Sequence, residues 1–401
     1  MFFVKKIEGT ITDKTLGWSF KPSDANGDKA YYAFEGYYPD RGGRLESEIF
    51  SAEKFPGEMA YYRLQFTAQT SQHCYWGVDF FDNNNQYAQP DHNDRIWAGP
   101  RQKYERLFQA SESVTRLQLF FMSTHGVDVS DIQLEKVSSR EAADWCEQVY
   151  TSIPPFDYHL PVDVFKQLPR TIDAVSRGKP LRVLLLGDSI INDTWNSMFY
   201  SRLQRDLPLF NLTFICSVRG STGCWYYQIP ENFKTYVGRY KPDLLIIGGI
   251  SQNNDIAAIG QVIDSACKQL GCEILLLSGA YARDTRIYDD TSRPDAELPA
   301  TIWNLEDEFS PQFIEQQSDK SSVMHQTPPD MRLLMLATDT QVAFIDMTTP
   351  TYKYVYASGK PYEFFNRNRV HSNIYGKQII GQILYQIFMD MVKADVRFGT
   401  F

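Results

Sequence analysis

Two patterns of hydrophobic and polar positions divide the chain. The first third alternates apolar and polar residues in short runs, whereas from about residue 178 continuous apolar runs alternate with segments of helical periodicity. Alternation with a period of two is typical of half-buried antiparallel strands, and continuous apolar runs between amphipathic helices are typical of a parallel sheet. The sequence therefore predicts a β-rich domain followed by an α/β domain.

The front segment, residues 1–138, has the pattern of a series of antiparallel strands. Aromatic and β-branched residues are frequent in it, and Gly, Asn, Asp and Pro interrupt it repeatedly. The alternation is clearest at residues 62–68, 115–121 and 127–137. Several such strands in succession predict an antiparallel β-sandwich or jelly roll.

The segment 139–177 is the expected linker between the two domains. It combines a short helix over 140–150 with the proline-bearing stretch 153–161. Residues 178–401 form the expected α/β domain, a parallel sheet with helices on both faces and therefore three layers. Its strands are expected at residues 183–186, 212–218, 244–247, 273–277 and 341–345, and its clearest helices at 194–207 and 375–392.

Composition narrows the class of protein. A chain of 401 residues with 43% hydrophobic and 22% charged residues is long enough for two domains with large cores. Its net charge of −9 argues against a nucleic-acid or anionic-membrane partner, because either would favour a basic surface. No apolar run is long enough to span a bilayer, and the first residues lack the apolar core of a signal peptide. We expect a cytoplasmic protein, or a secreted or periplasmic one if an export signal has been removed from this sequence.

The cysteines and most of the histidines offer little chemistry. The six cysteines have neither zinc-finger spacing nor the density of a disulfide scaffold, so buried thiols are expected. Cys216 with Cys224, and Cys267 with Cys272, are close enough in sequence for disulfides as an alternative. Five histidines have no metal-ligand spacing with carboxylates or thiols and are expected to be structural: His73, His92, His125, His159 and His325.

One apolar run ends in a candidate nucleophile. The run over 183–186 stops at Gly187-Asp188-Ser189 and leads into a segment with helical pattern. A serine at the carboxyl end of a buried strand and at a helix N-terminus lies where open α/β sheets place ligands, and where backbone N–H groups stabilise negative charge. The same residues also suit a turn and a helix cap, so both interpretations stay open at this point.

Four segments of the second domain, taken in order, resemble the blocks of the SGNH (GDSL-type) hydrolase superfamily. Gly187-Asp188-Ser189 resembles the block that carries the nucleophile. Segment 218–225 is similar to the second block, whose glycine gives a backbone N–H to the oxyanion hole, a role that the resemblance assigns to Gly223. Segment 242–255 resembles the third block, and Asn368-Arg369-Val370-His371 resembles the last, which carries the histidine base.

The third block departs from the family pattern. Where the family has an asparagine whose side chain donates to the oxyanion hole, this chain has Gln252, with Asn253 one position later. A carboxamide donor is present at either position, so the resemblance implies an oxyanion hole without deciding which of the two residues donates.

The last block departs as well, because Asn368 replaces the aspartate that the family has three residues before the histidine. An asparagine can orient the imidazole of His371 but cannot stabilise its cation, and a neutral third member costs about 10⁴ in rate in the serine-protease triad. Three possibilities stay open: a slow enzyme, a sufficient Ser–His dyad, or compensation by another carboxylate such as Asp193 or Glu363.

The resemblance implies a serine esterase that needs no cofactor and no metal. Ser189 is the expected nucleophile and His371 the expected base, while the backbone N–H groups of Ser189 and Gly223 serve the oxyanion hole. With a β-sandwich in front, the chain resembles carbohydrate esterases, so we expect removal of acyl groups, acetyl in the first place, from a carbohydrate through an acyl-enzyme. The alternatives are a lipase or arylesterase acting on lipid or small esters, and a glycan-binding protein whose hydrolase site has decayed.

Residues beside the first two blocks are the expected substrate contacts, with ordinary packing as the alternative: Asp188, Arg219, Trp225 and Tyr226. Aromatic faces suit sugar rings, and arginine suits carboxylates. In the front domain, four aromatic residues are expected to be exposed and able to stack on sugar: Trp76, Tyr87, Trp97 and Tyr104. The alternative is a sandwich that packs on the catalytic domain and shapes its cleft.

Overall fold

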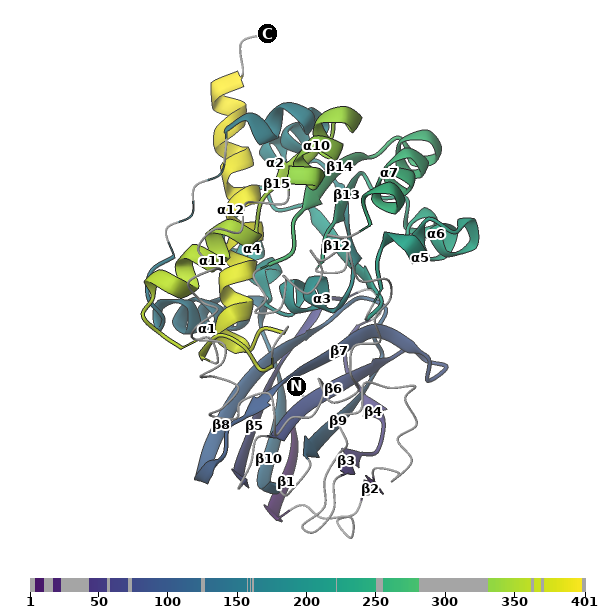
Figure 1. The fold of residues 1–401 in the computed structure, drawn as a ribbon. Helices are drawn as coiled ribbons and strands as arrows, with labels where there is room; N and C mark the ends of the chain where they lie inside the picture. Colours follow the sequence, from purple (N-terminus) through teal and green to yellow (C-terminus); the bar gives the residue numbers. More distant parts are fainter. Residues whose placement is uncertain are drawn as a thin grey trace, which may run out of the picture. The chain divides into compact units, whose positions relative to one another are not determined.

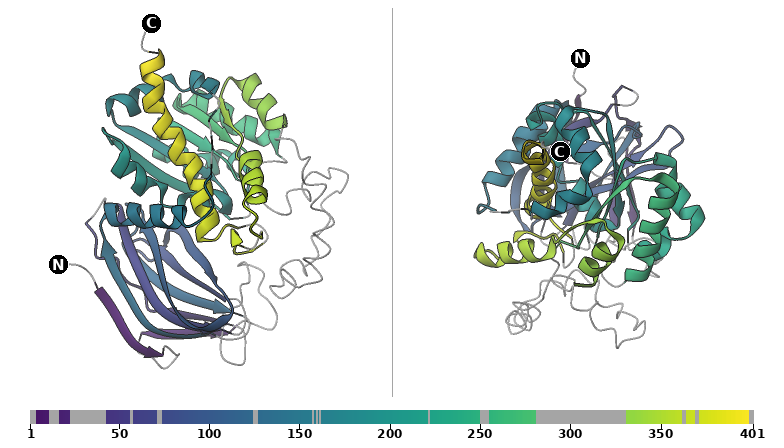
Figure 2. Two further views of the ribbon diagram at one scale, coloured as in Figure 1. Left: turned by 90° about the vertical axis from the view of Figure 1, so that its left-hand side faces the viewer. Right: turned by 90° about the horizontal axis from the view of Figure 1, so that it is seen from above.

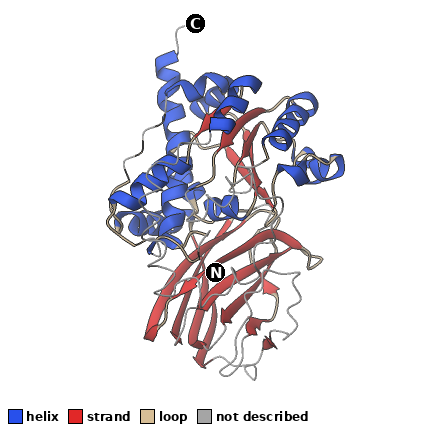
Figure 3. Cartoon of the chain, viewed as in Figure 1, coloured by secondary structure: helices blue, strands red, loops and turns tan. Residues whose placement is uncertain are grey.

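The computed structural model describes residues 4–10, 17–22, 43–55, 58–70, 74–123, 127–156, 158, 160, 162–220, 222–249, 255–280, 331–361, 364–368 and 371–398. The chain forms two compact units (Figure 1). Met1–Val149 and Met198–Asp206 make up the first unit, and Tyr150–Ser197 and Leu207–Phe401 make up the second. Strands dominate the first unit, whereas helices flank the sheet of the second (Figure 3).

Two antiparallel sheets build the first unit. The four-stranded sheet has the order β1-β10-β5-β8 and consists of β1 (Val4–Thr10), β10 (Val127–Val137), β5 (Ala60–Thr70) and β8 (Gly99–Ala110). The six-stranded sheet has the order β2-β3-β9-β6-β7, with β4 also paired to β9. Its strands are β2 (Trp18–Pro22), β3 (Gly43–Ser47), β4 (Phe50–Ser51), β6 (Cys74–Phe81), β7 (Tyr87–Ile96) and β9 (Arg116–Ser123).

Both sheets contribute to one apolar core, which is what their alternating sequences require. Trp76 on β6 and Tyr104 on β8 belong to this core, so the expectation that they are exposed is wrong. Trp76 is fully buried, and Tyr104 stacks on Phe66 with ring centroids 5.1 Å apart. Alternation identifies the two faces of a strand, but the aromatic content of both faces conceals which one points inward.

The described residues of this unit also form helix α4 (Phe199–Asp206) and all but the last two residues of helix α1 (Ser139–Thr151). A capping box begins α1, since the Glu141 carboxylate accepts from the Ser138 backbone N–H at 2.9 Å and the Ser138 hydroxyl accepts from the Glu141 N–H at 3.2 Å. Arg205 of α4 forms an ion pair with Asp144 of α1 at 3.0 Å. The ion pair connects α4 to α1, although about fifty residues separate the two helices in sequence.

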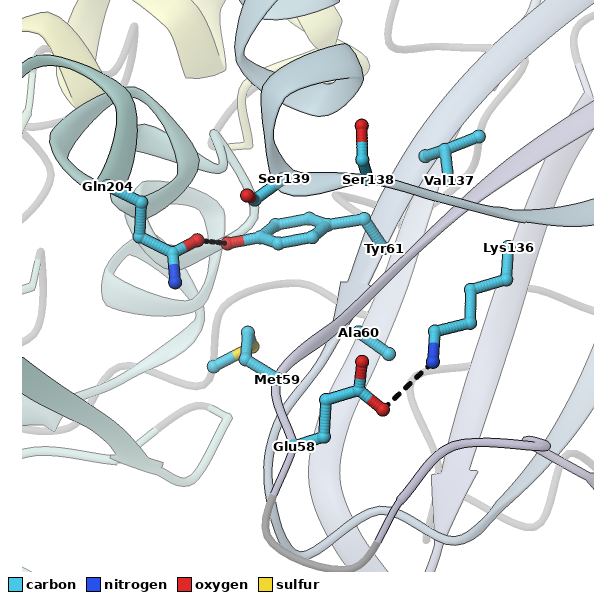
Figure 4. Close-up of a pocket in the computed structure, with 9 residues that line it drawn as sticks. All are labelled: Glu58, Met59, Ala60, Tyr61, Lys136, Val137, Ser138, Ser139 and Gln204. Carbon is cyan, nitrogen blue, oxygen red and sulfur yellow. Dashed lines mark hydrogen bonds and ion pairs between the residues drawn. The ribbon is translucent and has the colours of Figure 1, made fainter. Parts of the chain in front are cut away.

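A cavity of about 350 Å³ lies in the first unit, beside the start of α1 (Figure 4). Four of its polar side chains are bonded in pairs: Lys136 Nζ lies 2.8 Å from a Glu58 carboxylate oxygen, and the Tyr61 hydroxyl donates to Gln204 Oε1 at 2.8 Å. None of the candidate catalytic residues lines this cavity.

The second unit contains a parallel five-stranded sheet with the order β12-β11-β13-β14-β15. Its strands are β11 (Leu181–Gly187), β12 (Leu212–Val218), β13 (Leu244–Ile247), β14 (Glu273–Leu277) and β15 (Ala343–Ile345). Together with the antiparallel sheets of the first unit, this mixed α/β content confirms the coarse fold prediction. The helical elements of the second unit are η1 (Val162–Gln167), α2 (Pro169–Arg177), α3 (Ser189–Trp195), α5 (Cys224–Tyr227), α6 (Pro230–Tyr236), η2 (Gly238–Tyr240), α7 (Ile256–Leu270), α10 (Met331–Thr340), α11 (Thr348–Ala357) and α12 (Ile374–Phe398).

Helices pack on both faces of this sheet (Figure 2). Helices α5, α6, α7 and α10 form one apolar cluster with alternate residues of β11, β13 and β14. On the other face, Phe214 of β12 meets Phe388 of α12 edge-on, with centroids 5.2 Å apart. Among the described residues, no helix is both long enough and apolar enough to cross a bilayer.

The expectation of a helix over 194–207 is wrong. Helix α3 begins earlier, at Ser189, and ends at Trp195, and α4 begins only at Phe199. Between them Met198 has φ +58°, a left-handed conformation that an α-helix does not allow, and the Ser197 hydroxyl bonds the Thr194 carbonyl at 2.7 Å. The six cysteines are free thiols, so neither expected alternative disulfide is formed.

Candidate active site

The strand order places a candidate site between β11 and β13. In an open parallel sheet of this order, the connections after these two strands leave toward opposite faces, and ligands bind in the crevice at their carboxyl ends. The two strand ends approach closely here: a Cβ on Gly187 would lie 2.1 Å from the Gly248 carbonyl oxygen. Only glycine fits at position 187 without moving backbone.

Ser189 begins α3 directly after β11. The Asp188 side chain caps this helix, accepting from the Ile190 N–H at 2.9 Å, and it packs against Gly249, where a Cβ would lie 2.4 Å from Oδ1. Asp188 is 1% exposed, so capping is the role that the structure shows for it, and its expected contact with substrate stays a prediction. As the first helical residue, Ser189 has a backbone N–H without an intrahelical partner.

His371 lies on a tight segment before α12. The segment is closed by a bridge between Asn366 and Ser372 and by the Asn373 N–H, which donates to the Phe365 carbonyl at 3.0 Å. The Asn373 side chain caps α12, accepting from the Tyr375 N–H at 2.9 Å. Gly376, in the first turn of α12, lets the helix approach this segment, since a Cβ there would lie 2.1 Å from the Phe365 oxygen.

Ser189, His371 and Asn368 form a continuous hydrogen-bonded series. His371 Nε2 lies 2.8 Å from Ser189 Oγ, and His371 Nδ1 lies 3.0 Å from Asn368 Oδ1. The same Oδ1 accepts the His371 backbone N–H at 2.8 Å. Because this amide oxygen only accepts, Nδ1 must carry the proton and Nε2 is left as the acceptor for the serine hydroxyl. The series is therefore arranged for proton transfer from Ser189 to His371.

Electrostatics favours the neutral imidazole. Burial lowers the pKa of His371 well below its usual value of 6.5, and the nearby positive charges of Arg367 and Lys377 lower it further. A neutral imidazole can accept a proton, but forming its cation here costs more free energy than in water. A carboxylate at position 368 would oppose this cost, and the amide of Asn368 does not.

Asp193 occupies a different place from the one that a compensating carboxylate would need. One of its oxygens lies 2.7 Å from Arg367 Nη1, and the other accepts the Ser372 N–H at 2.9 Å. Both carboxylate oxygens are thus bonded to the segment that carries His371 and not to the imidazole ring. Glu363, the other carboxylate considered, lies outside the described residues.

Gly223, the expected oxyanion donor of the second block, is buried and precedes α5 as its cap residue. Helix α5 is anchored to the end of β11, because the Tyr227 hydroxyl donates to the Gly187 carbonyl at 2.6 Å. The same carbonyl accepts the Arg219 N–H, directly after β12, at 3.2 Å. Gln252 and Asn253 lie outside the described residues.

The other expected substrate contacts form an exposed group at the same end of β12. Trp225 is 48% exposed, Tyr226 is half-buried, and their rings meet edge-on with centroids 6.0 Å apart. The guanidinium of Arg219 lies 4.5 Å above the Tyr226 ring. We call Arg219, Trp225 and Tyr226 the aromatic ledge.

Sequence reasoning missed Arg367 as a part of the site. Arg367 directly precedes Asn368, but its partner Asp193 lies 174 positions earlier, and no local pattern indicates that pairing. Among the described residues, His, Cys, Asp and Glu side chains form no group of three or more that could hold a metal ion. His92 is buried beside Trp76, whereas His73, His125, His159 and His325 lie outside the described residues.

Comparison with known proteins gives distant structural likenesses only. No family model matches the chain, and neither does any curated protein. A two-domain esterase active on acetylated mannans is 12% identical with a TM-score of 0.41, and the match covers 57% of this chain and 53% of that one. This chain therefore matches about half the length of that esterase.

Two further solved structures are similar at the same level. An acetyl xylan esterase is 16% identical with a TM-score of 0.36, over 52% of this chain and 99% of that one. A peptidoglycan O-acetylesterase is 10% identical with a TM-score of 0.29, over 98% of this chain and 78% of that one. These likenesses are too distant to assign an activity.

Proposed function

We propose that this protein is a serine esterase that removes acyl groups, acetyl in the first place, from a carbohydrate through an acyl-enzyme intermediate. The observation that carries the proposal is the 2.8 Å contact between Ser189 Oγ and His371 Nε2 at the carboxyl edge of a parallel sheet. In this proposal the second unit is a three-layer hydrolase domain of the SGNH type, and the first is a jelly-roll module.

The chemistry follows from the hydrogen-bonded series. Ser189 Oγ attacks the ester carbonyl while its proton passes to His371 Nε2. The tetrahedral intermediate collapses, the C–O bond to the sugar breaks, and His371 returns the proton to the departing sugar hydroxyl. Water then attacks the acyl-serine and loses a proton to His371. As the bond between the acyl carbon and Ser189 Oγ breaks, His371 returns that proton to Oγ, which restores Ser189 and releases the carboxylic acid.

Backbone N–H groups at Ser189 and Gly223 are the proposed oxyanion donors, joined by Gln252 or Asn253. Each such donor is worth roughly 3 kcal/mol of transition-state stabilisation. Asn368 holds the proton of His371 on Nδ1, which keeps Nε2 free to accept. Its lack of charge predicts a modest turnover number compared with an enzyme that has aspartate at this position.

The aromatic ledge supports a sugar ester as substrate. Trp225 offers an exposed ring face, and Arg219 offers hydrogen-bond donors beside it. The three solved structures described above are acetyl esterases of glycans, but the choice of substrate here comes from the motifs and the ledge of this chain. On the first unit, Tyr87 is 65% exposed and Trp97 is half-buried, and both stay candidates for a glycan contact.

The test combines labelling with product release. A fluorophosphonate probe should label wild-type protein, and Ser189→Ala should abolish the label. Acetate release from acetylated xylan or mannan should exceed release of octanoate from p-nitrophenyl octanoate. A preference for the octanoate ester would indicate the lipase or arylesterase alternative. If Ser189 reacts no faster than free serine while the protein still binds glycan, the site has decayed, as the neutral Asn368 would allow.

A further inference from the structure

We propose that Asp193 and Arg367 are positioning residues that hold His371 in proton-transfer contact with Ser189. This inference rests on the proposed function, because it concerns the same serine and histidine. Both residues are buried, with Asp193 1% and Arg367 6% exposed. Their side chains bond each other and the backbone of Ser372, which is the residue after His371.

The two halves of the site come from distant parts of the sequence. Ser189 is the first residue of α3, whereas His371 lies 182 positions later, in the segment before α12. The hydrogen bond between the two side chains requires their backbones to keep a fixed separation. A displacement of about 1 Å between catalytic groups can cost about 100-fold in rate. A contact that joins α3 to the His371 segment therefore has a catalytic consequence.

Asp193 makes this connection from the helix side. It lies four residues after Ser189 on α3, so the two residues share one face of the helix. Its two oxygens bond Arg367 Nη1 at 2.7 Å and the Ser372 N–H at 2.9 Å. The nucleophile's own helix is thus fixed to the residue that directly follows His371 in sequence.

Arg367 makes the connection from the other side. Its backbone N–H donates to the His371 carbonyl at 2.9 Å, and its Nη1 donates to the Ser372 carbonyl at 2.5 Å. Arg367 therefore holds the His371 segment at two successive residues, with its main chain at His371 and its guanidinium at Ser372. The same guanidinium bonds Asp193. We call the set of bonds among Asp193, Arg367, His371 and Ser372 the clamp.

The charges of the clamp allow a test based on the pKa of His371, which a purely structural role of Asp193 and Arg367 would not change in opposite directions. Arg367 lies close enough to disfavour the imidazolium of His371. Asp193 carries the opposite charge, and one of its carboxylate oxygens lies 2.7 Å from the Arg367 guanidinium. Removing the carboxylate should therefore lower the pKa of His371 further, while removing the guanidinium should raise it, because the remaining unpaired charge has the opposite sign in the two variants.

The experiment compares Asp193→Asn, Arg367→Gln and the double variant. We expect kcat to fall about 100-fold in Asp193→Asn while KM stays within about two-fold. The acid limb of kcat/KM should move to lower pH in Asp193→Asn and to higher pH in Arg367→Gln. The double variant should exceed Asp193→Asn in kcat, because it leaves no unpaired buried charge. Two results would overturn the positioning role of Asp193 and Arg367. One is an unchanged kcat in both single variants. The other is an acid limb of kcat/KM that stays in place in the two variants or moves to the same side in both.

Glu273→Gln is the matched control. Glu273 is a buried carboxylate of the same unit. It lies at the amino end of β14, whereas the candidate site lies at the carboxyl ends of the strands. It accepts the Arg170 and Thr171 N–H groups, each at 2.8 Å, at the start of α2. Its substitution should lower the free energy of unfolding and leave the acid limb in place.

Direct titration separates this inference from the proposed function. The pKa of His371 can be followed by NMR of its imidazole carbon-bound protons, assigned by their loss in His371→Asn. If the wild-type protein releases no acetate and Ser189 is unreactive, the proposed function fails. The imidazole titrations of Asp193→Asn and Arg367→Gln still decide the clamp, because their opposite displacements do not depend on turnover.

Discussion

Asn368 Oδ1 lies 3.0 Å from Nδ1 of His371 and 2.8 Å from the backbone nitrogen of the same residue. One amide oxygen thus orients both the ring and the main chain of the proposed base. The arrangement has the geometry of a carboxylate–imidazole pair without its charge, so orientation and charge stabilisation can be measured separately in this protein.

Restoring the carboxylate should increase turnover. In Asn368→Asp the oxygen keeps both contacts and adds a negative charge that stabilises the imidazolium, so we expect kcat to rise at least about 10-fold, with about 10⁴ as the upper bound. The acid limb of kcat/KM should move to higher pH. Steady-state kinetics on p-nitrophenyl acetate between pH 4 and 9 measures both effects.

Asn373→Asp is the control for that substitution. It introduces the same charge into the same segment, but at the cap of α12, where aspartate still accepts from the Tyr375 N–H and loses only the side-chain N–H that donates to the Phe364 carbonyl at 2.9 Å. It should change kcat far less. An Asn368→Asp protein that folds normally yet turns over no faster than wild type would show that charge at this position does not limit the rate.

The pH profile of the wild-type protein should be displaced toward acid. Burial, and then Arg367 and Lys377, hold the pKa of His371 well below 6.5. The imidazole therefore stays neutral as the pH falls past 6.5, and kcat/KM should still be at its plateau value at pH 6. Stability behaves in the opposite way. Below pH 6.5 the unfolded chain takes up a proton on this histidine and the folded chain does not, so stability is lost as the pH falls.

Urea unfolding at pH 7 and pH 5 tests the stability part of this prediction. His371→Gln removes the titrating group and should reduce the loss of stability between the two pH values. An acid limb near pH 6.5 in the wild-type enzyme would contradict the depressed pKa.

The aromatic ledge should affect sugar esters selectively. In Trp225→Ala the lost ring contact is worth about 1 kcal/mol, so KM for an acetylated oligosaccharide should rise roughly five-fold. KM for p-nitrophenyl acetate should not change. Leu209→Ala is the comparison. Leu209 is 57% exposed and lies before the amino end of β12, whereas Trp225 follows its carboxyl end. Equal effects of the two substitutions would argue against a sugar contact at Trp225.

Gly187→Ala should destabilise the second unit. The new methyl group would lie 2.1 Å from the Gly248 carbonyl and 2.6 Å from Ile191 Cγ1, so the ends of β11 and β13 must move apart. We expect the free energy of unfolding to fall by about 2 kcal/mol or more. Gly238→Ala should be nearly neutral, since a Cβ there meets its nearest atom at 3.8 Å. Urea denaturation of both variants gives the comparison.

The strands of the parallel sheet could be located from sequence because burial on both faces leaves only apolar residues. The predicted ranges 212–218, 244–247 and 273–277 coincide with β12, β13 and β14. The predicted helix over 194–207 failed because its apolar period continues through Met198, where the backbone turns left-handed. Apolar periodicity indicates which residues are buried, but it does not show whether one uninterrupted helix carries them.

At the site, local motifs brought attention to Ser189 and His371, and the structure places their side chains in contact. Their catalytic roles stay predictions. The bond between Asp193 and Arg367 could not be predicted, since it joins residues from two motifs and depends on the packing of α3 against the segment before α12. The capping bond of Asp188 could not be predicted either, because a carboxylate beside a nucleophile looks the same in sequence whether it contacts substrate or caps a helix.

The assignment of Met198–Asp206 to the first unit means that the polypeptide passes between the units three times, after Val149, after Ser197 and after Asp206. A single cut near residue 150 would leave the apolar side chains of Phe199 and Leu203 attached to the wrong fragment. Exchange of the first unit for another β-domain thus needs three junctions, and the proposed nucleophile lies on a stretch bounded by two of them.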